Sequence, residues 1–84
     1  MKTLLLYSTS GCHLCELAQE IVFPLLDEYM VQVSVIEISE SDELVERFGV
    51  RIPVLVFEGV GQDELGWPFD SVLVRQYLDR VGCH

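Results

Sequence analysis

Two cysteines separated by two residues are the feature that most restricts how this chain can fold and react. Cys12 and Cys15 follow an apolar segment that ends at Tyr7 and a short run of small residues, and they begin a long helical pattern. Two thiols at this spacing can form a disulfide, and the unpaired N–H groups and the dipole at a helix N-terminus stabilise a thiolate. The sequence therefore predicts that Cys12 is a nucleophile with a lowered pKa. Cys15, one turn deeper beside Leu14, is predicted to be the resolving thiol.

The length and charge of the chain restrict its size and its partners. Its 84 residues allow a single domain, 1–84, and the 50% that are apolar suffice for a core without disulfide staples. Fourteen acidic against five basic residues give a formal net charge of −9. Nucleic acids and anionic membranes are bound chiefly through Lys and Arg, so we expect neither as a partner. We expect partners that are neutral or basic.

Cysteine usage indicates a reducing compartment. The chain has three cysteines, no apolar N-terminal segment of the kind found in secretory signals, and no apolar run near 18 residues. These features argue against a secreted disulfide framework and against a membrane span. We expect a cytoplasmic protein, and in that compartment a close cysteine pair is usually catalytic or metal-binding.

The first half of the chain reads as a strand, a helix and a second strand. Residues 2–7 form a continuous apolar run, typical of a strand buried on both faces of a sheet. Residues 14–29 have apolar side chains at helical spacing, and Pro24 within them predicts that the helix bends or ends early. Residues 31–38 are rich in β-branched side chains and predict a second strand, parallel to the first after a helical crossover.

The second half predicts a short helix, two more strands and a last helix. An acid-rich start at Ser39 precedes an apolar stripe that ends at Gly49 and is formed by Leu44, Val45 and Phe48. Residues 53–57 and 63–65 read as strands joined by a turn at 59–62. Asp70 is a good N-cap for a final helix with Val74, Tyr77, Leu78 and Val81 on its apolar face.

This order of elements, the Cys-x-x-Cys pair after the first strand, and Arg51-Ile52-Pro53 before the third strand resemble the glutaredoxins and the wider thioredoxin fold. In particular, Gly-Cys-His-Leu-Cys is similar to the motif of small bacterial glutaredoxin-like proteins. The resemblance implies an α/β fold with three α/β/α layers, the order β-α-β-α-β-β-α, and a four-stranded mixed sheet in the spatial order 2-1-3-4. It also implies a cis Pro53 beside the cysteine pair, with the backbone of Ile52 pairing with an incoming peptide or thiol.

The activity that the resemblance implies is thiol–disulfide exchange with protein or small-molecule disulfides. Glutathione or a thioredoxin-reductase-type reductant would restore the dithiol, and no tightly bound cofactor is expected. Typical dithiol glutaredoxins have a Gly-Gly pair before the last helix, where this chain has Gly66-Trp67-Pro68. Arg51 is the only basic residue that the sequence places near the site. We therefore expect glutathione to be only a weak reductant.

Several residues have a second reading. His13, if protonated, would lower the pKa of Cys12 further, and if it points to solvent it does little. Trp67 and Phe69 are expected to pack the loop onto the sheet, with a substrate groove as the alternative. The acidic side chains in the middle of the chain read as a solvated face. These are the side chains of residues 37, 40, 42, 43 and 46.

The cysteine pair also allows a different class of function. Cys12 and Cys15 with Cys83 and His84 could supply four zinc ligands, although adjacent residues 83 and 84 have the wrong spacing for a closed site. Cys83 by itself reads as a bystander thiol near the end of the sequence. Among glutaredoxin relatives, an iron–sulfur cluster shared between two subunits usually goes with a single active-site cysteine and bound glutathione, so the second cysteine and the altered loop before the last helix argue against one here. The alternative to an enzyme is thus a non-catalytic binding module, or a redox or metal sensor, that presents its Ile52-Pro53 edge to a partner.

Overall fold

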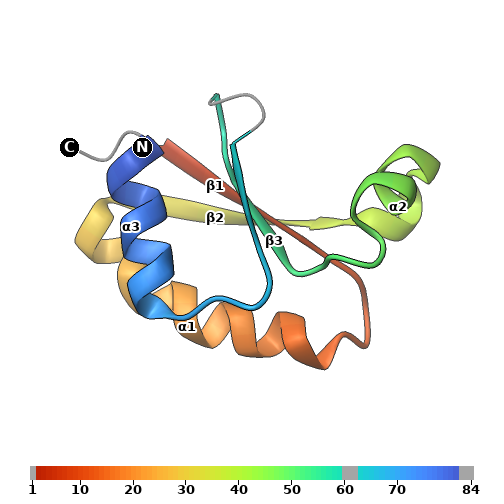
Figure 1. Cartoon of the computed structure of the whole chain (residues 1–84), viewed down its shortest axis with the longest axis horizontal. Coiled ribbons are helices and arrows are strands. Elements are labelled where there is room, and N and C mark those ends of the chain that lie inside the picture. The colour runs from red at the N-terminus through yellow and green to blue at the C-terminus, as the bar shows by residue number, and fades with distance from the viewer. Residues whose placement is uncertain (1, 60–62, 82–84) are drawn as a thin grey trace.

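The structure, a computed structural model, describes residues 2–59 and 63–81. Its strands are β1 (Lys2–Ser8), β2 (Val31–Glu37), β3 (Val54–Phe57) and β4 (Glu64–Gly66). They form one sheet in the order β2-β1-β3-β4 (Figure 1). β1 and β2 are parallel, whereas β3 is antiparallel to both of its neighbours. The predicted mixed sheet and its strand order are confirmed.

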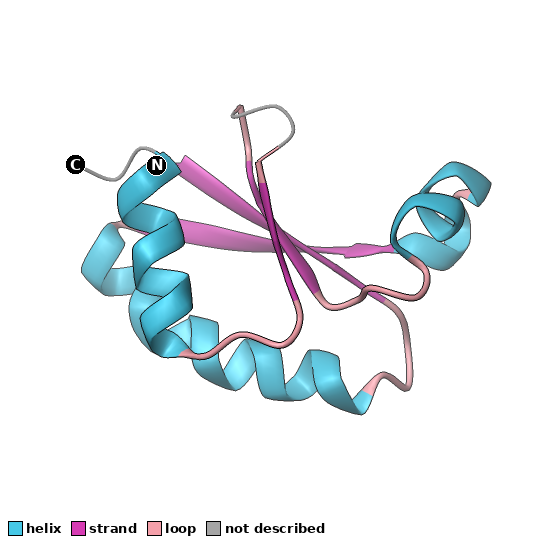
Figure 2. Cartoon of the chain, viewed as in Figure 1, coloured by secondary structure: helices cyan, strands magenta, loops and turns pink. Residues whose placement is uncertain are grey.

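Two helices cover one face of this sheet and a third, short helix packs at one end of the other face, which gives the molecule three layers (Figure 2). They are α1 (His13–Tyr29), α2 (Asp42–Phe48) and α3 (Ser71–Val81), and the 3₁₀ turn η1 (Ile38–Glu40) precedes α2. The main core lies between the sheet and the helices α1 and α3. Its buried residues include Leu4, Leu6, Leu55 and Phe57 from the sheet, Ala18, Val22 and Leu25 from α1, and Val74, Tyr77 and Leu78 from α3.

The second face of the sheet carries α2. Side chains alternate between the faces of a strand, so Tyr7 points away from the core that Leu4 and Leu6 enter. Its ring stacks on that of Phe48, the last residue of α2, with 4.4 Å between the ring centroids. Phe48 is 1% exposed. The contact between these two aromatic rings therefore attaches α2 beside the end of β1.

Helix α1 does not end at Pro24. It continues to Tyr29, which excludes the early end that was one of the two predicted effects of Pro24. Pro24 lacks the N–H that would bond the Glu20 carbonyl, but both residues lie on the exposed side of the helix, where water can satisfy that oxygen. Val22 and Leu25, on either side of Pro24, are buried and hold this part of the helix against the sheet.

Helix α2 starts later than predicted and has a narrower apolar face. Residues 38–40 form the 3₁₀ turn, and Ser41 is the N-cap of α2, with its hydroxyl accepting the N–H of Leu44 at 3.4 Å. Phe48 is buried as predicted, but the Val45 side chain is 45% exposed. Val45 was predicted to be buried from the spacing of apolar residues alone. In the structure, α2 buries only its last residue, Phe48, which contacts Tyr7 of β1.

The hairpin of β3 and β4 is attached to α3 through Tyr77. The Tyr77 hydroxyl accepts the backbone N–H of Phe57 at 2.9 Å and donates to the Asp63 carbonyl at 2.8 Å. β4 begins one residue later than predicted, and residues 60–62 of the predicted turn lie outside the described residues. The Asp70 carboxylate accepts the N–H of Leu73 at 2.9 Å, as predicted for an N-cap. No helix within residues 2–59 and 63–81 is long and apolar enough to cross a bilayer.

Candidate redox site

A tight turn delivers Cys12 from the end of β1 to the start of α1. The N–H of Cys12 donates to the carbonyl of Thr9 at 3.3 Å, which closes a four-residue turn over Thr9, Ser10, Gly11 and Cys12. Gly11 occupies the third position of this turn with φ 77°. A positive φ at that position is costly for any residue with a side chain, and this explains the glycine directly before the first cysteine.

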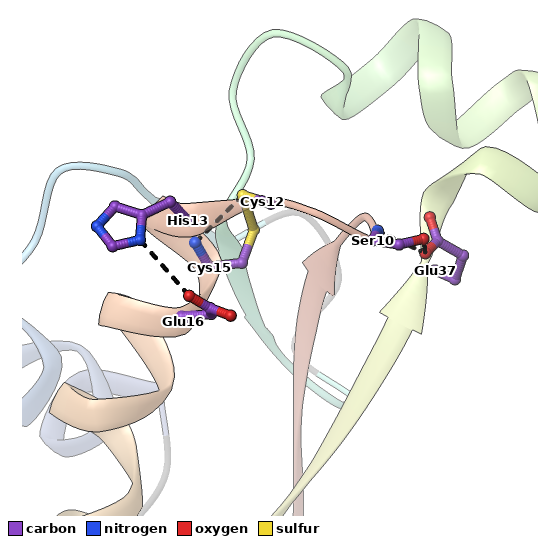
Figure 3. The surroundings of a disulfide bond; sticks show 6 residues. All are labelled: Ser10, Cys12, His13, Cys15, Glu16 and Glu37. Atoms are coloured by element: carbon purple, nitrogen blue, oxygen red, sulfur yellow. Dashed lines mark hydrogen bonds and ion pairs between the residues drawn. A yellow bond between two sulfur atoms is a disulfide. The ribbon is translucent and has the colours of Figure 1, made fainter.

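Cys12 and Cys15 form a disulfide at the N-terminus of α1, with 5.3 Å between their Cα atoms (Figure 3). Cys12 is the N-cap residue of the helix, and its Sγ accepts the backbone N–H of Cys15 at 3.1 Å. Cys15 is 3% exposed, whereas Cys12 is only partly buried. The two sulfurs are thus unequal: Cys12 is the accessible one, and it already receives a hydrogen bond from the helix backbone.

His13 points away from the disulfide. Its Nδ1 lies 3.5 Å from Glu16 Oε2, and both side chains are more than three-quarters exposed, at 79% and 77% (Figure 3). Of the two readings of His13 that the sequence allowed, this orientation favours the one in which the side chain faces solvent and the carboxylate of the next helical turn. The imidazole makes no direct contact with the Cys12 sulfur among the interactions of the described residues.

Ile52 and Pro53 lie at the same end of the sheet as the cysteine turn. Tyr7 pairs with Val54, so the preceding Pro53 is next to the end of β1, and the segment between α2 and β3 runs beside the β1–α1 turn in both views (Figures 1 and 3). The Ile52–Pro53 peptide bond is cis, and Pro53 is fully buried. The N–H of Ile52 donates to the Phe48 carbonyl at 3.1 Å, so this N–H already has a backbone partner within the chain.

Arg51 is held on the α2 face by two neighbours. Its guanidinium forms an ion pair with Glu64 of β4 and lies 5.3 Å from the centroid of the Phe48 ring. Arg47 approaches the same carboxylate, with 3.8 Å between its Nη2 and Glu64 Oε2, and lies 4.9 Å from the same ring. Glu64 therefore neutralises the one basic residue that the sequence placed near the site.

Glu37 is a residue of this site that the sequence reading missed. The sequence analysis counted it with the acidic side chains of a solvated face. In the structure its carboxylate accepts hydrogen bonds from the segment after β1 and from the segment after β2. Oε1 accepts the N–H of Ser10 at 2.9 Å and its hydroxyl at 3.2 Å, and Oε2 accepts the N–H of Ser39 at 3.1 Å (Figure 3). The Thr9 side chain also acts as a donor and contributes most, the N–H of Ser39 contributes next, and together with Ser10 they lower the pKa of Glu37 from 4.5 to about 2.

The remaining candidates take structural positions or lie outside the described residues. Trp67 and Phe69 pack edge to face at 5.0 Å and join the core, which confirms the packing interpretation of this loop. The Trp67–Pro68 bond is also cis, which no residue pattern indicated. Cys83 and His84, on which the zinc reading depended, lie outside the described residues. Within residues 2–59 and 63–81, no three His, Cys, Asp or Glu side chains are grouped to hold a metal.

Comparisons with known proteins agree with this geometry. The family described as the glutaredoxin-like domain (DUF836) matches residues 3–79. The structure of target protein XcR50 from X. campestris shares 33% identity, covers 94% of this chain and 99% of its own, and superposes with a TM-score of 0.75. No curated protein matches the sequence.

Two thioredoxins of lower identity share the fold. Oxidised thioredoxin O2 from Arabidopsis thaliana is 19% identical with a TM-score of 0.68, covering 96% of this chain and 75% of its own. Oxidised mitochondrial thioredoxin 3 from Saccharomyces cerevisiae is 18% identical with a TM-score of 0.69, covering 94% and 77%. The sheet order, the helix layers and the cysteine pair at the start of α1 all match the predicted fold. The chain belongs to the glutaredoxin-like domain family and has a thioredoxin fold with a Cys-x-x-Cys pair.

Proposed function

We propose that this protein is a thiol–disulfide oxidoreductase in which Cys12 is the nucleophile and Cys15 the resolving thiol. The observation that carries the proposal is the asymmetry of the pair. Cys12 is the more accessible sulfur and accepts the N–H of Cys15, while Cys15 is 3% exposed. A hydrogen bond from a helix N-terminus stabilises a thiolate more than a thiol, so the reduced protein should attack disulfides through Cys12.

The reaction transfers two electrons from the dithiol to the substrate. The Cys12 thiolate attacks one sulfur of a substrate disulfide, a mixed disulfide forms, and the other substrate sulfur leaves as a thiolate that takes a proton from water. Cys15 then loses its proton to solvent and attacks Cys12 Sγ. The second substrate thiolate leaves, and the Cys12–Cys15 disulfide remains. An external thiol, from glutathione or from a reductase with its own dithiol, reverses these steps.

Neutral or basic polypeptide disulfides suit this site better than anionic glutathione. Glutathione has two carboxylates and one amine, so a site for it normally offers cations and free backbone N–H groups. Here Arg51 and Arg47 are paired with Glu64, and Pro68 has no N–H. The Asp70 carboxylate already accepts the N–H of Leu73 at the start of α3. The net charge of the chain, −9, also repels an anionic ligand at low salt. We therefore propose that glutathione is a weak reductant for this protein.

The rate of alkylation of the reduced protein as a function of pH tests the assignment of the two thiols. We expect one fast-reacting thiol with a pKa below the free value of about 8.5, lost in Cys12→Ser and retained in Cys15→Ser. If Cys12→Ser keeps the fast thiol, the roles of the cysteines are wrong. A binding module or sensor without exchange activity would show no turnover of any disulfide, whatever the pKa of its thiols.

A further inference from the structure

Glu37 links two segments that meet at the redox end of the sheet. It is the last residue of β2 and pairs in register with Ser8, the last residue of β1. Its Oε1 accepts both the N–H of Ser10, at 2.9 Å, and the hydroxyl of Ser10, at 3.2 Å. Its Oε2 accepts the N–H of Ser39 at 3.1 Å. One carboxylate thus ties the segment after β1 to the segment after β2.

Ser10 belongs to the turn that presents Cys12. The N–H of Cys12 bonds the Thr9 carbonyl within this turn, and Gly11 supplies the positive φ. Figure 3 shows Glu37 approaching Ser10 from the side away from the two sulfurs, so the carboxylate supports the turn without touching the disulfide. The turn is therefore held from inside by its own backbone bond and from outside by Glu37.

We propose that Glu37 is a positioning residue of the redox site. Its carboxylate holds the turn from Thr9 to Cys12 in the shape that places Cys12 Sγ at the N–H of Cys15. The effect on turnover rests on the proposed exchange function, whereas the effect on the turn and on the Cys12 thiol does not. No residue motif assigned this role, because Glu37 and Ser10 are 27 residues apart and meet only through the strand register.

The arrangement requires a carboxylate. An ionised carboxylate accepts hydrogen bonds at both oxygens, and here two donors of Ser10 and the N–H of Ser39 bond to its two sides, in addition to the Thr9 side chain. The amide of Gln has only one acceptor oxygen, and its NH₂ would face either Ser10 or the N–H of Ser39. Asp is shorter by one methylene and cannot reach both segments from the same backbone position. Both substitutions remove part of the link while changing little volume.

Loss of position and loss of charge have opposite effects on Cys12. Removing a nearby negative charge lowers the pKa of a thiol, because the thiolate is repelled less. Loosening the turn raises that pKa, because Cys12 Sγ loses the hydrogen bond from the N–H of Cys15. His13 and Glu16 pair with each other, Arg47 and Arg51 pair with Glu64, and all of these groups are unchanged in a Glu37 variant. The sign of the pKa change in Cys12 therefore separates the two effects.

The test compares the reduced wild-type protein with Glu37→Gln and with a charge-matched control, Glu58→Gln. Glu58 is exposed, and its N–H pairs with Thr3 at the opposite end of β1. For Glu37→Gln we expect hydrogen exchange of the Ser10 amide to be faster by about tenfold, as for the loss of one charge-assisted bond. We also expect the alkylation profile to show a raised pKa for Cys12. Glu58→Gln should change neither.

Unchanged exchange at Ser10, or a lowered pKa of Cys12 in Glu37→Gln, would overturn the proposal. Ser10→Ala keeps Glu37 and its backbone bonds but removes the hydroxyl donor, so it should give a smaller change. When Ser10→Ala is combined with Glu37→Gln, the additional effect of Ser10→Ala should largely disappear, because both substitutions remove the same interaction. If Glu37→Gln does not fold, Glu37→Asp and Ser10→Ala carry the test. Both readouts are independent of turnover, so a wild-type protein that reduces no disulfide would contradict the proposed function and leave the result for Glu37 standing.

Discussion

At the scale of single residues, the charged state of Glu37 makes the redox end sensitive to acid. Its hydrogen bonds lower its pKa in the folded protein from 4.5 to about 2, so the folded state binds fewer protons than the unfolded state between these values. The stabilisation is complete above the unfolded pKa and is lost as the pH falls toward about 2. The contribution of Glu37 to stability should therefore disappear in acid.

Thermal unfolding of wild type and Glu37→Gln at pH 6 and at pH 2 measures this loss. We expect wild type to have the higher Tm at pH 6, and the difference to shrink to nearly nothing at pH 2. All other ionisable groups are common to both proteins, so their titration cancels in the difference. An equal difference at both pH values would show that the carboxylate form of Glu37 is not what stabilises the turn.

The residues of the site differ in how far the sequence could reveal them. Some features of the site are local, because each interaction joins residues that are three positions apart in the sequence. These are the cysteine pair, the N-cap Asp70 and the turn that contains the glycine before Cys12. The contacts of Glu37 with Ser10 and of Arg51 with Glu64 join different strands and loops. Such pairs depend on register and on side-chain direction, which a pattern of residue types does not fix.

At the scale of elements, Pro24 is a weak point of α1 that the fold tolerates. It lies inside a continuous helix from His13 to Tyr29, about three turns beyond Cys12. Pro24→Ala restores the N–H for the Glu20 carbonyl and removes a residue that costs about 3 kcal/mol in a helix interior. Part of this gain is offset, because alanine gives the unfolded chain more freedom. We expect the free energy of unfolding to rise by about 1–3 kcal/mol.

Chemical denaturation of Pro24→Ala, with Glu20→Ala as the control, measures this gain. Glu20 lies on the same exposed side of α1, and glutamate and alanine have similar helix propensities, so the control should stay within about 0.5 kcal/mol of wild type. The alkylation rate of Cys12 should be unchanged in both variants. A destabilised Pro24→Ala would mean that the proline shapes the helix to fit the sheet.

The elements themselves were largely predictable. Hydrophobic periodicity and turn residues located the strands and α-helices of the described residues to within a few residues, because most of these elements bury one face or both in the core. The errors occurred where tertiary contacts decide the outcome. The sequence could not show that buried Val22 and Leu25 would carry α1 through Pro24, nor that α2 would bury Phe48 and expose Val45.

At the scale of the whole molecule, the charge distribution should select among disulfides. Each of the four arginines is paired with a carboxylate, with Glu64 accepting both Arg47 and Arg51, Glu28 accepting Arg75 and Asp63 accepting Arg80. The arginine side chains of the described residues are therefore all neutralised by acidic partners, and the net charge of the chain is −9. An anionic substrate is repelled at low salt, and a basic one is attracted.

Reduction of matched peptide disulfides by the dithiol form measures this selectivity. At low ionic strength we expect a basic peptide to react about tenfold faster than an acidic one of the same length, with a neutral peptide between them. The ratio should fall as salt is added, because the Debye length shortens to about 10 Å at 0.1 M. Glutathione disulfide should behave like the acidic peptide. Equal rates at low salt would contradict the proposed selection by charge.

The fold of the whole molecule was predicted from the order of the elements and from the family resemblance. The sheet topology and the family match confirm this prediction. The sheet order 2-1-3-4 was predicted from the resemblance to the thioredoxin fold, and the structure has this order. The distribution of ion pairs over the surface could not be predicted, since it depends on which strands and helices lie side by side. The proposed preference for basic partners thus rests on the ion pairs of the assembled fold as well as on the composition.

The central claim is that Cys12 attacks and Cys15 resolves. The most direct measurement is mass spectrometry of reduced Cys15→Ser after incubation with a peptide disulfide, because this variant lacks the proposed resolving thiol that would release a mixed disulfide. We predict a stable adduct of one peptide thiol mapped to Cys12, no such adduct on Cys12→Ser, and only the Cys12–Cys15 disulfide in wild type. The absence of an adduct on Cys15→Ser, or an adduct on Cys83 with Cys12 free, would contradict the claim.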